Sequence, residues 1–343
     1  MKVTLAANHG DIGGGEVMLF AIAEQLRAIG RAVQVVAPAS PSVVADQALA
    51  LGFPVVTIHG EGTRRYLSGL RRWDARERTG LLWANGLRPA LATAGHRRRI
   101  VHLHQIPHGA QIFAARVASQ GARRVLVPSV AMRQAIGWES TVLENWTQQV
   151  TPAPPLHWPD AQITLGFLGR PSMDKGIGVL ADALRILQDR QPGRYRLLIG
   201  GEPRFVSEAA QREVESALHP VRHLVDRPGW MTREGFFGAV DVAVVPSIAP
   251  ESFGLVVAEA MSAGVPCVVS DVAALREVAG PDHPWVARAG DAESLADEIG
   301  RAAGTDPSRL EAARRRWASE FSPEAGAQRI ASLMTELAEE ELR

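Results

Sequence analysis

The sequence predicts an α/β protein with two doubly wound domains, each built on a parallel sheet. Short β-branched runs alternate with amphipathic stretches of helical length along the 343 residues, a pattern typical of βα units. The proline-rich stretch Thr147–Asp160 has no hydrophobic period, which predicts a linker. Two domains joined in this way are expected to face a central cleft with the carboxyl ends of both sheets.

The expected strands fall into two series, one on each side of the linker. Before it they are Val3–Ala7, Ala32–Ala37, Pro54–Ile58, Leu81–Ala84, Ile100–His104, Arg124–Val127 and Val142–Glu144. After it they are Ile163–Leu168, Arg196–Ile199, His223–Val225, Val242–Val245, Pro266–Val269 and Trp285–Val286. We therefore expect an N-terminal domain over residues 1–152 and a C-terminal domain over residues 153–320. A tail helix over 321–343 is expected to pack back toward the N-terminal domain.

Composition excludes several classes of protein. The 37 basic and 37 acidic residues balance, so charge gives no support for a nucleic-acid partner. No apolar run is long enough to span a membrane, and the N-terminus predicts a strand, not a signal peptide. Cytoplasmic residence is the default expectation. The single cysteine, Cys267, excludes disulfides and a cysteine-based metal site.

Two glutamates in the block from Asp241 to Asp271 carry the most information. Glu251 ends a proline-containing turn after an apolar strand, and Glu259 interrupts the apolar helix expected to start near Phe253. The first free N–H groups of such a helix attract phosphate oxygens, and eight helical residues span roughly 12 Å. This predicts an anion site with polyol contacts at both ends. The alternative is a solvated Glu251 and a chance spacing, which the apolar surroundings of Glu259 disfavour.

Two glycine-containing turns follow the first strand of each domain. Gly13-Gly14-Gly15 opens a helix and could let a ligand approach the backbone, although a plain tight turn fits as well. In the second domain, Arg170 and Lys175 bracket the turn and could clamp a diphosphate. Only Lys2 and Lys175 are lysines in an arginine-rich chain, which favours a specific role for the second one. A surface arginine and a Lys175–Asp174 pair are the alternative.

Three histidines lie at the end of the fifth strand. His102 and His104 alternate onto one face of that strand, with His108 beyond it. A zinc site is the less favoured interpretation, because no acidic residue lies nearby. We expect His104 to face the cleft as a hydrogen-bond donor or base.

The remaining arginine clusters all fall in the first domain: Arg64-Arg65, Arg71-Arg72, Arg76, Arg78 and Arg97-Arg98-Arg99. Solvated helix faces are the preferred interpretation, with an anionic acceptor or membrane surface as the alternative. An Asp-x-Asp metal motif, a G-x-S-x-G elbow and a Walker lysine motif are all missing from the sequence.

Three segments together resemble the retaining glycosyltransferases of family four, which have the two-domain GT-B fold with two Rossmann-like domains and an E-x7-E block. They are GGGEVMLFAIAEQLRAIGRAVQVVAP, GFLGRPSMDKGIGVLADAL and GAVDVAVVPSIAPESFGLVVAEAMSAGVPCVVSD. The similarity covers the chain in order. One departure is Ala273-Ala274, where the family often has a glycine pair, which loosens any role for Glu277. The loop His9–Gly15 is short, so acceptor contacts there are left open.

The resemblance implies roles for individual residues. Arg170 and Lys175 would bind the donor diphosphate, Glu251 the sugar hydroxyls and Glu259 the ribose, while His104 would stand near the reacting sugar. The implied catalytic residues are His104, Arg170, Lys175 and Glu251. The implied donor-binding residues are Gly14, Gly15, Arg170, Lys175, Gly229, Trp230, Met231, Glu251, Ser252, Phe253, Gly254, Leu255 and Glu259.

The expected reaction is transfer of a hexose, with retained configuration, from a nucleotide diphosphate sugar to a hydroxyl acceptor. The acceptor class, whether glycolipid, polysaccharide or small molecule, stays open. No metal and no cofactor beyond the donor are expected. A nucleotide-sugar epimerase and a non-catalytic nucleotide-sugar-binding protein are the alternatives, and a peripheral contact with the inner membrane face remains open as well.

Overall fold

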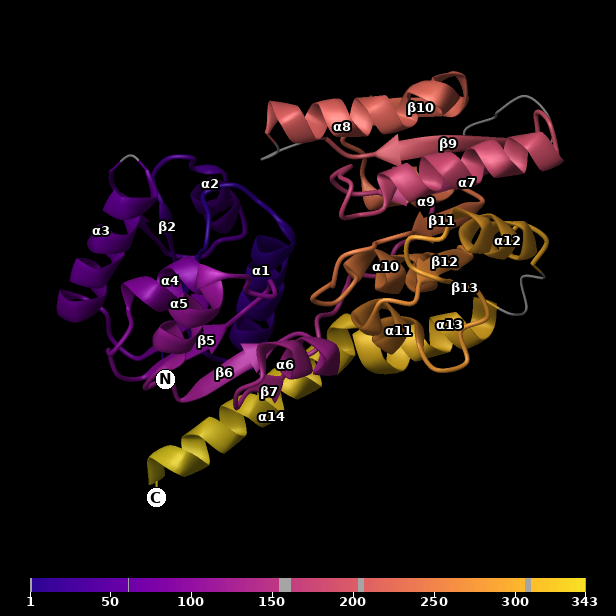
Figure 1. The fold of residues 1–343 in the computed structure, drawn as a ribbon. Helices are drawn as coiled ribbons and strands as arrows, with labels where there is room; N and C mark the ends of the chain where they lie inside the picture. Colours follow the sequence, from indigo (N-terminus) through magenta and orange to yellow (C-terminus); the bar gives the residue numbers. More distant parts are fainter. Residues whose placement is uncertain (1, 61, 154–161, 203–206, 306–309, 343) are drawn as a thin grey trace. The chain divides into compact units, whose positions relative to one another are not determined.

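The computed structural model describes residues 2–60, 62–153, 162–202, 207–305 and 310–342 (Figure 1). The chain divides into two compact units, Met1–Trp146 with Pro323–Arg343, and Thr147–Ser322. Each unit contains one parallel sheet with helices, so the predicted α/β class is confirmed. None of the described helices is both long and apolar enough to cross a membrane.

The described residues of the N-terminal unit form a seven-stranded parallel sheet in the order β3-β2-β1-β4-β5-β6-β7. Its strands are β1 (Lys2–Ala6), β2 (Ala32–Pro38), β3 (Val55–Ile58), β4 (Leu81–Asn85), β5 (Arg99–His102), β6 (Arg124–Val127) and β7 (Thr141–Val142). Its helices are α1 (Gly14–Ala28), α2 (Val43–Ala50), α3 (Thr63–Arg76), α4 (Leu87–Ala92), α5 (Ala110–Ser119), α6 (Val130–Ile136) and α14 (Pro323–Leu342).

The C-terminal unit has a six-stranded parallel sheet in the order β10-β9-β8-β11-β12-β13 among its described residues. The strands are β8 (Ile163–Leu168), β9 (Tyr195–Gly200), β10 (Val225–Gly229), β11 (Val242–Val245), β12 (Cys267–Ser270) and β13 (Val286–Ala287). The helices are α7 (Ile177–Arg190), α8 (Glu208–Leu218), α9 (Arg233–Ala239), α10 (Leu255–Ala263), α11 (Ala273–Ala279), α12 (Ala292–Ala302) and α13 (Leu310–Arg316). A 3₁₀ turn, η1 (His219–Leu224), and a π-helical turn, η3 (Trp317–Phe321), complete it.

The helix α14 belongs to the N-terminal unit although it ends the chain. Gly326 lies directly against the ring of Trp146, where an added Cβ would come within 2.3 Å of the indole. Near the end of the helix, the Arg123 guanidinium donates to the Leu337 carbonyl at 2.6 Å. Leu337 is fully buried, so the helix contributes its apolar face to the core of this unit.

The first residues of the predicted linker pack onto the C-terminal unit. Backbone amides of Thr147 and Val150 donate to the Phe321 carbonyl and the Ser262 hydroxyl, at 2.9 and 3.2 Å. The Val150 side chain is buried in the core of the C-terminal unit. The sequence did not predict that Val150 is buried, because a single valine among prolines and polar residues gives no hydrophobic periodicity. Residues 154–160 of the predicted linker lie outside the described part of the chain.

Strand β5 is shorter than predicted and ends at His102, so His104 lies beyond the strand. The physical reason is the register, since His102 pairs with Asn85, the last residue of β4, and with Leu126, next to the end of β6. Past this point β4 has ended, and only β6 remains as a neighbour, where the Leu103 amide donates to the Leu126 carbonyl. Strand β10 likewise begins at Val225, because His223 belongs to the 3₁₀ turn.

Several of the N-terminal arginines are structural, which neither sequence interpretation anticipated. Arg99 is fully buried and donates to the carbonyls of His96, Ala90 and Gln120. Arg78 bonds the carboxylate of Asp74 and three backbone carbonyls, those of Gly80, Arg97 and Arg98. These guanidinium groups satisfy backbone carbonyls in helices and in the turns before strands, so they are not available to an anionic ligand.

The buried Asp74 carboxylate should be a main contributor to the stability of the N-terminal unit. Its side chain is fully buried and is bonded by both Arg78 and His96. Asp74→Asn removes the charge that faces these partners, so we expect a loss of about 3–5 kcal/mol in the free energy of unfolding. Urea denaturation is the measurement, with the exposed Asp46→Asn as control. A loss no larger than the control's would contradict this assignment.

Candidate functional site

The carboxyl edge of the C-terminal sheet brings two turns into direct contact. One turn joins β8 to α7 and the other joins β11 to α10. The backbone amides of Ile248 and Ala249 both donate to the Asp174 carbonyl, at 3.0 and 3.2 Å. Gly176 lies so close to the other turn that an added Cβ would be 1.8 Å from the Pro246 oxygen. The two turns therefore form one rigid junction.

An ion pair crosses this junction. The Lys175 ammonium lies 2.5 and 2.6 Å from the two carboxylate oxygens of Glu251. The predicted alternative, a pair between Lys175 and Asp174, is wrong, since Asp174 contributes its backbone carbonyl to the other turn instead. The Glu251 side chain is 13% exposed and that of Lys175 is 41% exposed, so the pair stays accessible from the lysine side.

Two serines that the sequence analysis missed hold the Glu251 carboxylate in place. The Ser247 hydroxyl donates to Glu251 Oε1 at 2.5 Å, and the Ser270 hydroxyl donates to the Ser247 carbonyl at 2.6 Å. Both serines are almost fully buried. Their position at or just beyond strand ends was the available signal, because the carboxyl ends of parallel strands gather at one edge of the sheet.

The helix after Glu251 begins two residues later than predicted. Gly254 is its N-cap, with a φ of +112°, and α10 runs from Leu255. Ser252 and Phe253 therefore precede the helix, and the Phe253 side chain is buried against the Phe321 ring. Because the cap is a glycine with no side chain to accept hydrogen bonds, the first N–H groups of α10 keep their affinity for an anion.

Glu259 is nearly buried within α10 and has a partner that the sequence analysis did not identify. The Arg233 Nε donates to Glu259 Oε1 at 2.8 Å. The other carboxylate oxygen, Oε2, is buried with no hydrogen-bond partner among the described residues. An unsatisfied buried carboxylate oxygen is costly, so this oxygen is a ready acceptor for a ligand hydroxyl.

The other predicted donor-site residues of this unit are more exposed. Arg170 is exposed, and within the described residues it has no hydrogen-bond or ion-pair partner. Trp230 follows Gly229 at the end of β10 and is 64% exposed, which leaves its ring face free for stacking. Met231 is half-buried and packs against the apolar core near α10.

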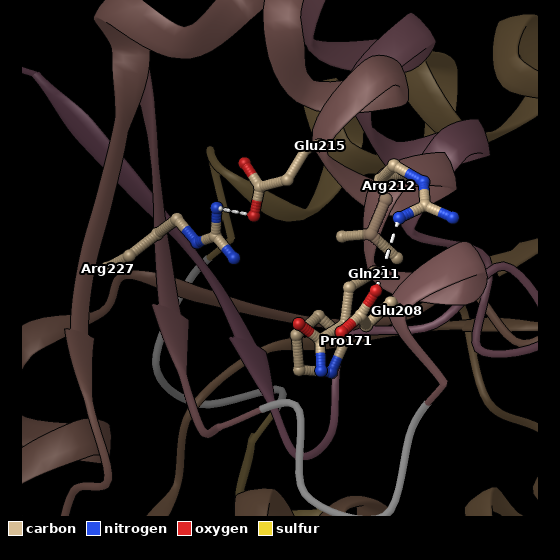
Figure 2. Close-up of a pocket in the computed structure, with 7 residues that line it drawn as sticks. Pro171, Glu208, Gln211, Arg212, Glu215 and Arg227 are labelled. Atoms are coloured by element: carbon tan, nitrogen blue, oxygen red, sulfur yellow. Dashed lines mark hydrogen bonds and ion pairs between the residues drawn. The ribbon is translucent and has the colours of Figure 1, made fainter.

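A pocket of about 280 Å³ lies on the same unit, beside the turn that joins β8 to α7 (Figure 2). Its lining residues are Pro171, Glu208, Gln211, Arg212, Val214, Glu215 and Arg227. The charges there pair with one another, as in the 2.6 Å contact of Arg227 with Glu215. None of the predicted site residues lines this pocket, although Pro171 belongs to the turn that joins β8 to α7.

The N-terminal unit carries the glycine turn and the histidines at the carboxyl edge of its own sheet. Gly13 caps α1, and Gly14 and Gly15 are its first residues. The Glu16 carboxylate accepts the Gly13 amide at 3.2 Å, and burial raises the pKa of this carboxyl group. The structure thus places the predicted turn directly on a helix N-terminus.

His104 lies next to this helix start and is neutral at physiological pH. Burial lowers the pKa of the His104 imidazole to about 4, and that of His102 well below its ordinary value. Such a weakly basic ring is a poor proton acceptor, which disfavours the predicted role of base. His104 Nε2 lies 2.8 Å from the side-chain oxygen of Asn85, a residue not predicted from the sequence.

No group of three or more histidine, cysteine or carboxylate side chains suited to a metal occurs in the described part of the chain. Cys267 is buried, and burial raises the pKa of its thiol to about 12. This thiol is therefore not a nucleophile at neutral pH.

The glycine at the junction should be required for its integrity. Gly176 and Gly193 have the same left-handed conformation, with φ of +75° and +76°, but nothing lies within 4 Å of the Cβ position at Gly193. We expect Gly193→Ala to cost about 1–2 kcal/mol from conformation alone. Gly176→Ala adds a backbone clash, so its loss of stability should be at least about twice as large. Thermal unfolding is the measurement, and equal losses in both variants would contradict the junction.

Comparison with known proteins agrees with this geometry. Residues 162–304 match the family model described as "Glycosyl transferases group 1". The chain is 27% identical to the phosphatidyl-myo-inositol mannosyltransferase of Mycobacterium leprae, over 84% of this chain and 83% of that protein. It is 39% identical to the D-inositol 3-phosphate glycosyltransferase of Xylanimonas cellulosilytica, over 33% and 27% of the two chains.

The structural comparison gives the fold of the whole chain. The crystal structure of Anabaena Alr3699/HepE in complex with UDP-glucose has a TM-score of 0.84 at 20% identity, over 98% of this chain and 100% of that one. The glycosyltransferase WaaG has a TM-score of 0.70 at 15% identity, over 96% and 99%. The resemblance expected from the three sequence motifs is thereby confirmed. Residues 162–304 therefore form a group 1 glycosyltransferase domain, and the two parallel-sheet units of the chain have the GT-B fold.

Proposed function

We propose that the protein is a retaining, metal-independent hexosyltransferase that uses a nucleotide diphosphate sugar as donor and a hydroxyl group as acceptor. The observation that carries this proposal is the Lys175–Glu251 pair beside the glycine-capped N-terminus of α10. A cation and free backbone N–H groups suit a diphosphate. A carboxylate oriented by Ser247 suits sugar hydroxyls next to it.

The two ends of the donor follow from the remaining residues of the C-terminal unit. Glu259 has one unsatisfied carboxylate oxygen, and the two adjacent hydroxyls of a ribose would satisfy it. Exposed Trp230 offers a ring for the nucleobase, and exposed Arg170 offers a second cation for the diphosphate. We assign Glu251 to binding and not to covalent catalysis, because its carboxylate is already engaged by Lys175 and Ser247.

In the proposed mechanism, the acceptor hydroxyl attacks the anomeric carbon on the same face from which the diphosphate departs. The acceptor oxygen forms a bond to the anomeric carbon while the bond from that carbon to the diphosphate oxygen breaks. The acceptor proton passes to the departing phosphate. Lys175 and the N–H groups of α10 stabilise the charge that develops on that phosphate. The absence of an activated nucleophile among the described site residues supports this course, since Cys267 and His104 are respectively protonated and weakly basic.

The relatives support the choice of substrates. Alr3699/HepE was crystallised with UDP-glucose, which favours a nucleotide-sugar donor here. The names of the curated relatives, a phosphatidyl-myo-inositol mannosyltransferase and a D-inositol 3-phosphate glycosyltransferase, favour a polyol or lipid-linked acceptor. A lipid-linked acceptor would bring this otherwise cytoplasmic enzyme to the inner membrane face as a peripheral protein.

Variants at the ion pair test the proposal. We expect Lys175→Ala and Glu251→Ala each to lower transfer by about 100-fold or more, because each removes a group that contacts the donor in the transition state. The donor is first selected from a panel of nucleotide sugars by thermal shift, since a ligand at 100 times its dissociation constant stabilises by about 2.7 kcal/mol. Transfer and donor hydrolysis are then followed by chromatography.

Matched controls are available in the same chain. Lys2→Ala removes the only other lysine, and Glu293→Ala removes a glutamate whose side chain is 65% exposed. Both should retain full transfer. Full activity in Lys175→Ala and Glu251→Ala would refute the proposal. An epimerised sugar formed from donor alone would favour the epimerase, and binding without turnover would favour a non-catalytic protein.

A further inference from the structure

We propose that Asn85 is a positioning residue for the transfer reaction, because it fixes the ring orientation and tautomer of His104 and ties that ring to the start of α1. This inference rests on the proposed function, in which His104 contacts the reacting sugar. Nothing in the sequence motifs assigned a role to Asn85. Its position at the carboxyl end of β4 places it beside both elements.

The Asn85 carboxamide uses both of its ends. Its Nδ2 donates to the Gly15 carbonyl at 2.8 Å, and its Oδ1 lies 2.8 Å from His104 Nε2. Asn85 is fully buried, so water does not compete for either contact. A buried amide with both ends satisfied holds its partners at fixed positions.

These contacts determine the tautomer of His104 without further assumption. A carbonyl oxygen can only accept, so the Asn85 amide nitrogen must face Gly15 and the amide oxygen must face His104. That oxygen also only accepts, so His104 Nε2 must carry the proton. In the neutral ring the lone pair therefore resides on Nδ1. This atom is buried and has no hydrogen-bond partner among the described residues.

The ring is also confined by packing. The rings of His102 and His104 lie 4.0 Å apart between centroids. A Cβ added to Gly15 would lie 3.4 Å from His104 Cδ2, so the first turn of α1 closes directly onto the ring. His102 in turn has its own Nδ1 within 3.4 Å of Trp83 Nε1. Rotation of His104 would thus require Asn85 to release it.

The consequence differs from the role predicted from the sequence. His104 does not present a free N–H donor or a base, because Nε2 is committed to Asn85 and burial lowers the pKa of the ring to about 4. The nitrogen left over is a hydrogen-bond acceptor, which a sugar hydroxyl can satisfy by donating. By fixing the tautomer of His104, Asn85 would therefore determine that the sugar hydroxyl donates its hydrogen bond to Nδ1.

Nuclear magnetic resonance of ¹⁵N-histidine-labelled full-length protein tests the structural half directly. The unliganded wild type should show His104 as the Nε2–H tautomer, neutral down to about pH 4. In Asn85→Ala the tautomer preference should weaken. In Asn85→Asp a carboxylate faces Nε2–H, so the pKa of His104 should rise by about 1 or more. Unchanged tautomer and pKa in both variants would overturn the proposal, whatever the enzyme's activity.

Kinetics test the functional half. Asn85→Ala should lower kcat by about tenfold or more while the KM for the donor stays within about twofold, because misplacement of a contact to the reacting sugar affects the transition state most. Thr93→Val is the matched control, since Thr93 is equally buried and donates one hydrogen bond, to Pro89, at 2.8 Å. A kcat for Asn85→Ala equal to that of Thr93→Val would overturn the proposal. Loss of transfer in Lys175→Ala with normal transfer in Asn85→Ala would refute this inference alone and leave the proposed function intact.

Discussion

The pairing of the Lys175 ammonium with the Glu251 carboxylate is the interaction on which the candidate donor site depends. A carboxylate that is 13% exposed needs a partner to offset the loss of hydration, and the only lysine of the C-terminal unit supplies it. The same contact joins the turn after β8 to the turn after β11, which also share the Asp174 carbonyl. The ion pair and the shared carbonyl thus hold the two turns together at the carboxyl edge of the sheet.

Glycines make this arrangement sterically feasible. Gly176 lets the two turns touch, and Gly201 lies against the backbone of Gly169, where an added Cβ would be 2.2 Å from its carbonyl oxygen. At both of these places a side chain would push apart backbones that carry polar groups toward a ligand. In the N-terminal unit, Gly15 only contacts His104, since an added Cβ would lie 3.4 Å from the ring. The polar side chains and the glycines around them therefore function together.

The fold could be predicted from the sequence. The alternation of β-branched and amphipathic runs predicted each described strand of both sheets to within a few residues. The sequence was also sufficient to select Lys175 and Glu251, because a lone lysine and an acid in a turn stand out locally. It did not reveal that these two residues pair. The partners Ser247, Arg233 and Asn85 were missed because their roles arise from strand order and through-space contact. The Asp74 network was missed for the same reason.

The central claim is that Lys175 binds the diphosphate of the donor and Glu251 binds its sugar. Calorimetric titration tests this claim most directly. Wild type, Lys175→Ala and Glu251→Gln would each be titrated with the preferred nucleotide sugar and with its nucleoside diphosphate. We predict that Lys175→Ala weakens the binding of both ligands, because both carry the diphosphate. Glu251→Gln should weaken only the nucleotide sugar. Equal effects of Glu251→Gln on both ligands, or wild-type affinities in both variants, would contradict the assignment of these two residues.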